Sequence, residues 1–146
     1  RPLFKKDLML EYATKLDGEI RKKGGKTVLM MVWSKFKRPG TYEAVKRTHT
    51  DIASKLKARI APVGTAWKLA RSERPDTDIA TKKDPFGFYL NACVIYAVLT
   101  GRSPEGLSNA GMKGLDSDTA AFLQKIAARA VSDFDTQPGA DPKESQ

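Results

Sequence analysis

The chain has 146 residues, of which 40% are hydrophobic and 29% are charged. This length suits one globular domain with a substantial core and argues against two domains. A single cysteine excludes an intrachain disulfide, and the printed sequence contains no recognisable secretory or membrane-spanning segment, so we expect no membrane partner and leave the localisation open.

The net charge of +9 is spread unevenly along the chain. Residues 1–83 contain 21 Lys and Arg against 9 Asp and Glu, whereas residues 84–146 contain 5 against 8. The basic half is therefore expected either to face an acidic partner or to remain solvated.

The first predicted helix covers residues 7–23. Apolar side chains recur there at every fourth position, which is the pattern of an amphipathic helix: Leu8, Tyr12, Leu16 and Ile20, with Met9 and Ala13 alongside. Gly24 and Gly25 end this helix.

Residues 27–33 form a continuous apolar run, which predicts an interior parallel strand covered on both faces. Thr41 is expected to cap a second helix with an inward face of Ala44, Val45, Thr48, Ile52 and Leu56. Residues 59–63 follow as a short strand, and Pro62 places it at the sheet edge or marks its end. The order strand, helix, strand predicts a right-handed βαβ unit.

A short helix over residues 64–72 should direct Trp67 and Ala70 inward, and residues 74–83 are expected to form a loop. Asp84 and Pro85 then predict a helix start, and Gly101 predicts its stop. The helix between them is apolar on almost every side, so we expect it to be packed on several sides. Its Cys93 is expected to be a buried and unreactive thiol.

The glycine-rich stretch 106–116 predicts a surface loop. Asp116 or Ser117 should cap a final helix whose inward residues are Phe122, Leu123, Ile126, Ala130 and Phe134. We therefore expect one domain over residues 1–135 and a disordered polar tail over residues 136–146.

The pattern Pro85-x-Gly87-x-Tyr89-Leu90-x-Ala92, continuing to Tyr96-Ala97-x-Leu99-Thr100-Gly101-Arg102-Ser103-Pro104, resembles the last helix of bacterial SGNH (GDSL-type) hydrolases. In that family an Asp-x-x-His-Pro-Ser-Pro-x-Gly motif leads into the helix. Here Lys82 stands at the histidine position and Ile79 at the aspartate position, with Asp78 one residue out of register. The resemblance thus implies the scaffold of the family without its catalytic pair.

The fold implied by the resemblance is α/β, three-layer and flavodoxin-like. It would have a partial parallel sheet, a βαβ core over residues 27–63 and helices on both faces. The chain would correspond to about the second half of an SGNH domain, without the early strands and the serine, glycine and asparagine that name the family. Strand 27–33 would then have an unpaired edge, so we expect a homo-oligomer or a partner chain to complete the sheet.

Catalytic and metal signatures are weak in this sequence. The only histidine, His49, lies mid-helix in a basic segment, which favours a helix-surface position over a role as general base. Residues 115–117 (Leu-Asp-Ser) resemble a GDS nucleophile turn, but their position before a helix favours a cap. One cysteine and one histidine cannot form a usual zinc site, and no cofactor is indicated.

Basic residues are the positive indication of a ligand. Lys35, Lys37 and Arg38 follow the apolar strand, and ligands of open α/β sheets bind at the carboxyl ends of strands. Lys82 and Lys83, placed on the same rim by the resemblance, complete this set of candidates for an anionic ligand. The alternative is an ordinary solvated surface.

Three hypotheses of function follow. The first is a divergent or partial SGNH-like domain that is not catalytic alone and acts through binding or assembly. The second is one part of a composite ester hydrolase whose serine comes from a missing half or a partner chain. The third is a basic module that binds anions or nucleic acid.

Overall fold

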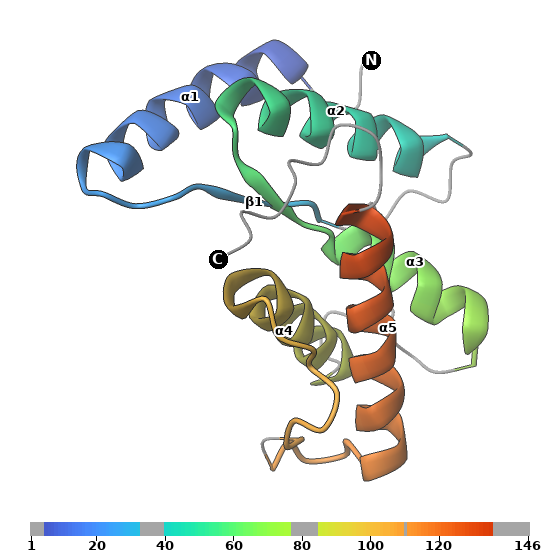
Figure 1. Ribbon diagram of the computed structural model, residues 1–146. Coiled ribbons are helices and arrows are strands. Elements are labelled where there is room, and N and C mark those ends of the chain that lie inside the picture. Colours follow the sequence, from blue (N-terminus) through green and yellow to red (C-terminus); the bar gives the residue numbers. More distant parts are fainter. Residues whose placement is uncertain (1–4, 33–39, 77–84, 110, 136–146) are drawn as a thin grey trace.

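The computed structural model describes residues 5–32, 40–76, 85–109 and 111–135 (Figure 1). Five helices account for most of these residues, and two short strands form the sheet. The elements are, in chain order, α1 (Lys6–Lys22), β1 (Val28–Met30), α2 (Thr41–Leu56), β2 (Arg59–Ala61), α3 (Val63–Glu73), α4 (Pro85–Thr100) and α5 (Ser117–Asp135).

The three-layer, flavodoxin-like α/β fold expected from the resemblance is wrong for this chain, and the hydrolase class attached to that fold gains no support. The described residues form a mainly helical protein whose sheet is a single parallel pair, β1 with β2. A physical reason lies at the end of β2. Pro62 has no N–H with which to extend the ladder, and its carbonyl oxygen accepts hydrogen bonds from Thr65 and Ala66 in the first turn of α3.

The two strands are joined through α2, so the predicted βαβ connection is present. The register pairs Val28 with Arg59 and Met30 with Ala61. Side chains alternate along β1, and the two faces of the sheet differ accordingly. Met31 packs with Val45 of α2, whereas Val28 packs into the core around α3, α4 and α5.

Helices α3, α4 and α5 build the larger core below the sheet (Figure 1). The buried residues of α4 include Leu90, Val94 and Val98, and those of α5 include Leu123 and Ile126. Gly64 sits where α3 meets the end of β1: its N–H bonds to the Met31 carbonyl oxygen at 2.7 Å, and a Cβ there would lie 3.0 Å from the Val32 carbonyl oxygen. A residue without a side chain permits this close approach.

The loop between α4 and α5 is held by one buried glutamine. Gln124 Nε2 donates to the Tyr89 hydroxyl and to the Leu107 carbonyl oxygen, at 2.7 Å each, and Gln124 Oε1 accepts from the Gly106 N–H. Tyr89 in turn donates to the Ser108 carbonyl oxygen. This network satisfies polar groups at the base of the large core.

The start of α2 differs from the sequence prediction. Gly40, with a positive φ of 78°, occupies the N-cap position, and Thr41 is the first helical residue. The buried face of α2 includes Val45, His49 and Ile52, whereas Ala44 is exposed. His49 is thus a buried residue and not the surface histidine that the basic surroundings suggested.

Candidate interaction surface

The outer edge of β1 carries no strand among the described residues. Arg59 N–H donates to the Thr27 carbonyl oxygen and Met31 N–H donates to the Ala61 carbonyl oxygen. In a parallel pair, alternate residues turn their backbone groups toward the partner strand, so those of Val28 and Met30 point away from β2. We call the backbone of Val28 and Met30 the open edge.

The opposite edge of the sheet offers far less to a further strand. By the same alternation, only Ile60 of β2 turns its N–H and carbonyl oxygen outward. Pro62 follows directly, and its carbonyl oxygen is already bonded within α3. A strand that extends this sheet therefore has its best template at β1.

An apolar groove lies beside the open edge, between the sheet and α4. Its volume is about 210 Å³, and it is lined by Val28, Met30, Ala61, Ile95, Val98 and Leu99. The side chain of Met30 on the strand is 46% exposed, and that of Leu99 on the helix is 64% exposed. The groove thus exposes the kind of surface that a folded protein usually covers.

Helix α4 continues this apolar surface. Phe88, Ala92, Ile95 and Leu99 recur at helical spacing and are exposed or half-buried, and we call these four residues the α4 stripe. The sequence analysis expected α4 to be packed on several sides, and α3, α5 and β2 do contact it. The α4 stripe was missed, although a helix without a polar face in a chain with so few strands was the signal for it.

A second apolar row lies on α1, on the other side of the sheet from α4 (Figure 1). Leu8, Tyr12, Leu16 and Ile20, which we call the α1 stripe, are the residues that the fourfold spacing identified, and all four are exposed. Leu16 is 63% exposed, and Ile20 packs against Gly25 at the end of the helix. The amphipathic helix is confirmed, but its apolar stripe has no cover among the described residues.

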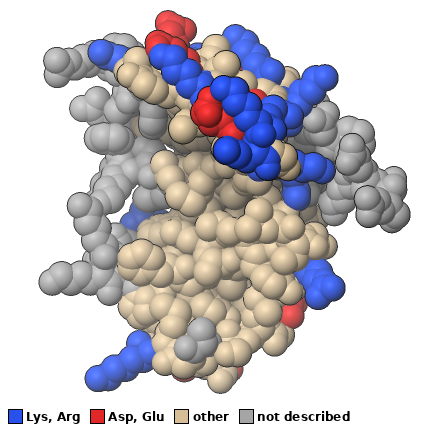
Figure 2. All heavy atoms as spheres, turned by 90° about the vertical axis from the view of Figure 1, so that its left-hand side faces the viewer, with Lys and Arg blue, Asp and Glu red and all other residues tan. Residues whose placement is uncertain are grey.

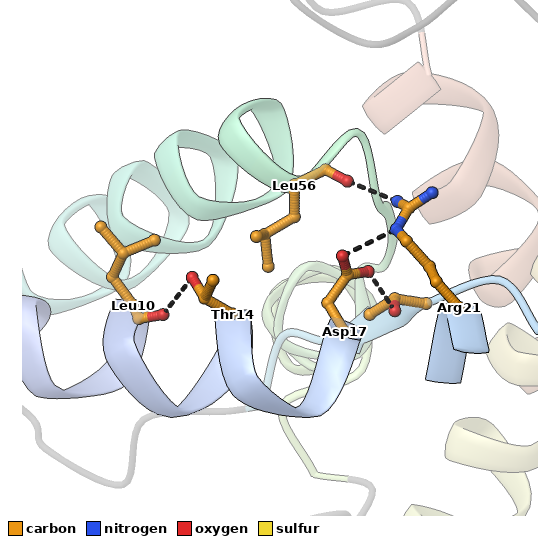
Figure 3. Close-up of polar contacts among 6 residues, drawn as sticks. Leu10, Thr14, Asp17, Arg21 and Leu56 are labelled. Atoms are coloured by element: carbon orange, nitrogen blue, oxygen red, sulfur yellow. Dashed lines mark hydrogen bonds and ion pairs between the residues drawn. The ribbon is translucent and has the colours of Figure 1, made fainter. Parts of the chain in front are cut away.

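Polar contacts fix α1 over the start of β1 (Figure 3). The Asp17 carboxylate accepts from Arg21 Nε at 2.7 Å and from the Thr27 hydroxyl at 2.5 Å, and Arg21 Nη2 also donates to the Leu56 carbonyl oxygen at the end of α2. The hydrogen bonds from Arg21 and Thr27 lower the pKa of the Asp17 carboxyl below its ordinary value of 3.8. The carboxylate is therefore ionised at neutral pH and ties α1 to the strand.

Charge is distributed unevenly on this side of the molecule. Figure 2 shows Lys, Arg, Asp and Glu gathered in a band at the top, at the level of α1, and few charged side chains on the broad surface below. The open edge thus lies between a charged helix and an apolar groove. This arrangement can accept an extended apolar segment through backbone hydrogen bonds and side-chain burial.

The ligand residues predicted from the sequence lie elsewhere. The anion-binding candidates Lys35, Lys37, Arg38, Lys82 and Lys83 fall outside the described residues, as do Asp78 and Asp84. They stay predictions.

The remaining reactive side chains have structural roles. His49 Nδ1 donates to the Val45 carbonyl oxygen at 2.9 Å, and burial lowers the pKa of the ring below 6.5. Cys93 is buried as predicted, and burial raises the pKa of its thiol to about 11, so thiolate is scarce at neutral pH. Asp116 Oδ1 accepts from the Thr119 N–H at 2.7 Å, which confirms that residues 115–117 cap a helix.

Within the parts of the chain that the structure describes, no group of three or more His, Cys, Asp or Glu side chains could hold a metal ion. No helix in those same ranges is both long and apolar enough to cross a membrane.

Comparison with models of known protein families, with curated protein sequences and with solved structures finds no match. The resemblance to SGNH hydrolases therefore stays a prediction.

Proposed function

We propose that this protein is a binding module that accepts an extended segment of another polypeptide as a further strand of its sheet. The observation that carries the proposal is the open edge of β1, which lies directly beside the apolar groove. The incoming strand would bond to the backbone of Val28 and Met30 and bury its alternate side chains in the groove. This is the sheet-completing partner expected from the sequence.

The balance of exposed and buried surface supports the proposal. An unpaired strand edge with apolar side chains exposes a protein to uncontrolled association, and folded proteins usually protect such edges with charge, bulges or a covering element. Here the edge residue Met30 and the helix residue Leu99 are both apolar and both largely exposed. A bound strand would remove these side chains from water and satisfy the outward backbone groups together.

The test measures binding of a labelled apolar peptide of about six residues, the usual length of a strand, to the full chain by fluorescence anisotropy. We expect binding that is lost when alternate peptide amides are N-methylated, because N-methylation removes the donors that the open edge requires. Met30→Lys should weaken binding by about tenfold or more, since a charge in the groove would have to be desolvated.

Leu107→Lys is the matched control, because Leu107 is also apolar and exposed but lies in the loop before α5. It should leave the affinity unchanged, and circular dichroism should show the same helix content for both variants. The proposal is wrong if no apolar peptide binds, or if the two variants weaken binding equally.

A further inference from the structure

The charges on either side of β1 restrict which strand can pair with it, an inference that rests on the proposed function. Residues 17–26, which lead into the strand, contain four basic residues and two carboxylates. Residues 31–42, which follow it, contain three basic residues and no carboxylate. The chain is therefore net positive on both sides of the open edge.

The carboxylates of the leading segment are already engaged. Asp17 pairs with Arg21 at 2.7 Å and Glu19 pairs with Lys22 at 2.6 Å. Lys23 and Lys26 follow these pairs and lie closest in sequence to β1, where the side chains of residues 21–26 are exposed. The excess positive charge thus lies at the entrance of the strand.

Pairing of β1 with a second copy of itself conflicts with this charge distribution. A two-fold symmetric pair of edge strands is antiparallel, so residues 17–26 of one copy would lie beside residues 31–42 of the other, at both ends of the new ladder. Each of these contacts would place positive charge beside positive charge. Like charges across paired strands are destabilising, so the structure favours a different polypeptide.

The faces of the slot define the middle of the partner strand. Its side chains would alternate between the two faces of the sheet. Those on one face would meet the groove at Met30 and Leu99, and those on the other would turn toward α1, where Thr27 bonds to Asp17 and the α1 stripe is exposed. Both sets must be apolar.

We infer that the partner of this chain is a polypeptide segment with an apolar strand at its centre and Asp or Glu at both of its ends. Acidic residues at both ends would complement the basic sequence on either side of β1, in either strand direction. The shared apolar centre would supply affinity, and the acidic ends would supply selection against the chain itself and against basic strands.

The experiment compares three labelled peptides that share one apolar core and carry acidic, neutral or lysine ends, bound to the full chain. A fourth peptide with acidic ends and a glycine-serine core controls for attraction by charge alone. We expect the acidic-ended apolar peptide to bind about tenfold more tightly than the neutral one and the lysine-ended one to bind more weakly still. The differences should shrink as the salt concentration rises from about 0.05 M to about 0.5 M, because salt screens exposed charges.

Charge reversal on the chain locates the effect. Lys23→Glu should reduce the preference for acidic ends several-fold, whereas Lys125→Glu, the same change on an exposed position of α5, should leave it unchanged. Equal affinity for the three apolar peptides, or tight binding of the glycine-serine peptide, would overturn the inference on acidic ends. Failure of every apolar peptide to bind would instead overturn the proposed function.

Light scattering on the purified chain tests self-pairing directly. We expect a monomer. A dimer that Met30→Lys dissociates would show that β1 pairs with its own copy, which would overturn the inference while leaving the strand-accepting edge in place.

Discussion

His49 couples folding to pH although it takes no part in a reaction. Burial favours the neutral ring, and the bond from Nδ1 to the Val45 carbonyl oxygen offsets part of that effect. The folded protein therefore resists a proton that the unfolded chain accepts below its ordinary pKa of 6.5. The contribution of this group to stability is complete above that pH and is lost as the pH falls toward the folded pKa.

We expect the free energy of unfolding in urea to be lower at about pH 5 than at about pH 7.5. His49→Asn, which keeps a donor for Val45 but does not titrate, should flatten this dependence. The lowered pKa of Asp17 does not interfere, because its ordinary value is 3.8 and its effect appears only in more acidic solution. An unchanged slope in His49→Asn would contradict the assignment.

Two glycines in helices provide a matched pair of substitutions. Gly64→Ala would place a Cβ 3.0 Å from the Val32 carbonyl oxygen, so we expect it to destabilise the fold by about 1–3 kcal/mol through overpacking. Gly18→Ala meets no atom within 4 Å and should stabilise α1 by about 0.5–1 kcal/mol. Thermal unfolding of both variants checks this, and a stabilised Gly64→Ala variant would show that α3 can move away from β1.

At the scale of elements, α4 tests whether an apolar helix needs cover on every side. Leu90 is fully buried and Leu99 is 64% exposed, although both are leucines of the same helix. Leu90→Ala should cost about 2–5 kcal/mol, because it removes buried methyl groups and leaves a cavity. Leu99→Ala should change the free energy of unfolding by about 0.5 kcal/mol or less.

Urea unfolding of the two leucine variants provides the measurement. A large cost for Leu99→Ala in the isolated chain would mean that something already covers the α4 stripe. The same substitution should nevertheless weaken binding of the apolar peptide, because Leu99 lines the groove. Stability and binding would then separate at one position.

At the scale of the whole molecule, the two sides of the sheet differ in core size. The cluster around α3, α4 and α5 contains most of the buried side chains, whereas the cluster beneath α2 consists of Met31, Val45 and Phe134 with two half-buried neighbours. Helix α1 contacts mainly α2 and leaves its apolar stripe exposed. Regions with few buried apolar contacts open at lower free energy than the main core.

Hydrogen exchange should therefore proceed in a defined order, with α1 amides first, α2 next and α4 and α5 last. Mass spectrometry of the exchanging chain at neutral pH measures this order. Binding of the apolar peptide should slow exchange at Val28 and Met30, whose amides point away from β2. Equal protection of α1 and α4 would contradict the view that α1 is held mainly by its polar contacts.

The sequence by itself determined the helices and the two strands. Periodicity identified α1, the Asp84–Pro85 and Gly101 signals bounded α4, and Asp116 was recognised as a cap, because these features depend on side chains within a few residues of one another. The apolar runs located β1 and β2, and their spacing predicted the parallel connection through α2. The need for a partner at the strand edge was likewise expected.

Only the tertiary structure decided how these elements share their apolar surface. A run of apolar residues does not state how many neighbours it has, so a three-layer sheet was expected where one strand pair forms. The burial of His49 and the exposure of the α1 and α4 stripes were hidden for the same reason. Burial depends on which distant segments arrive at a side chain, and no local spacing contains that information.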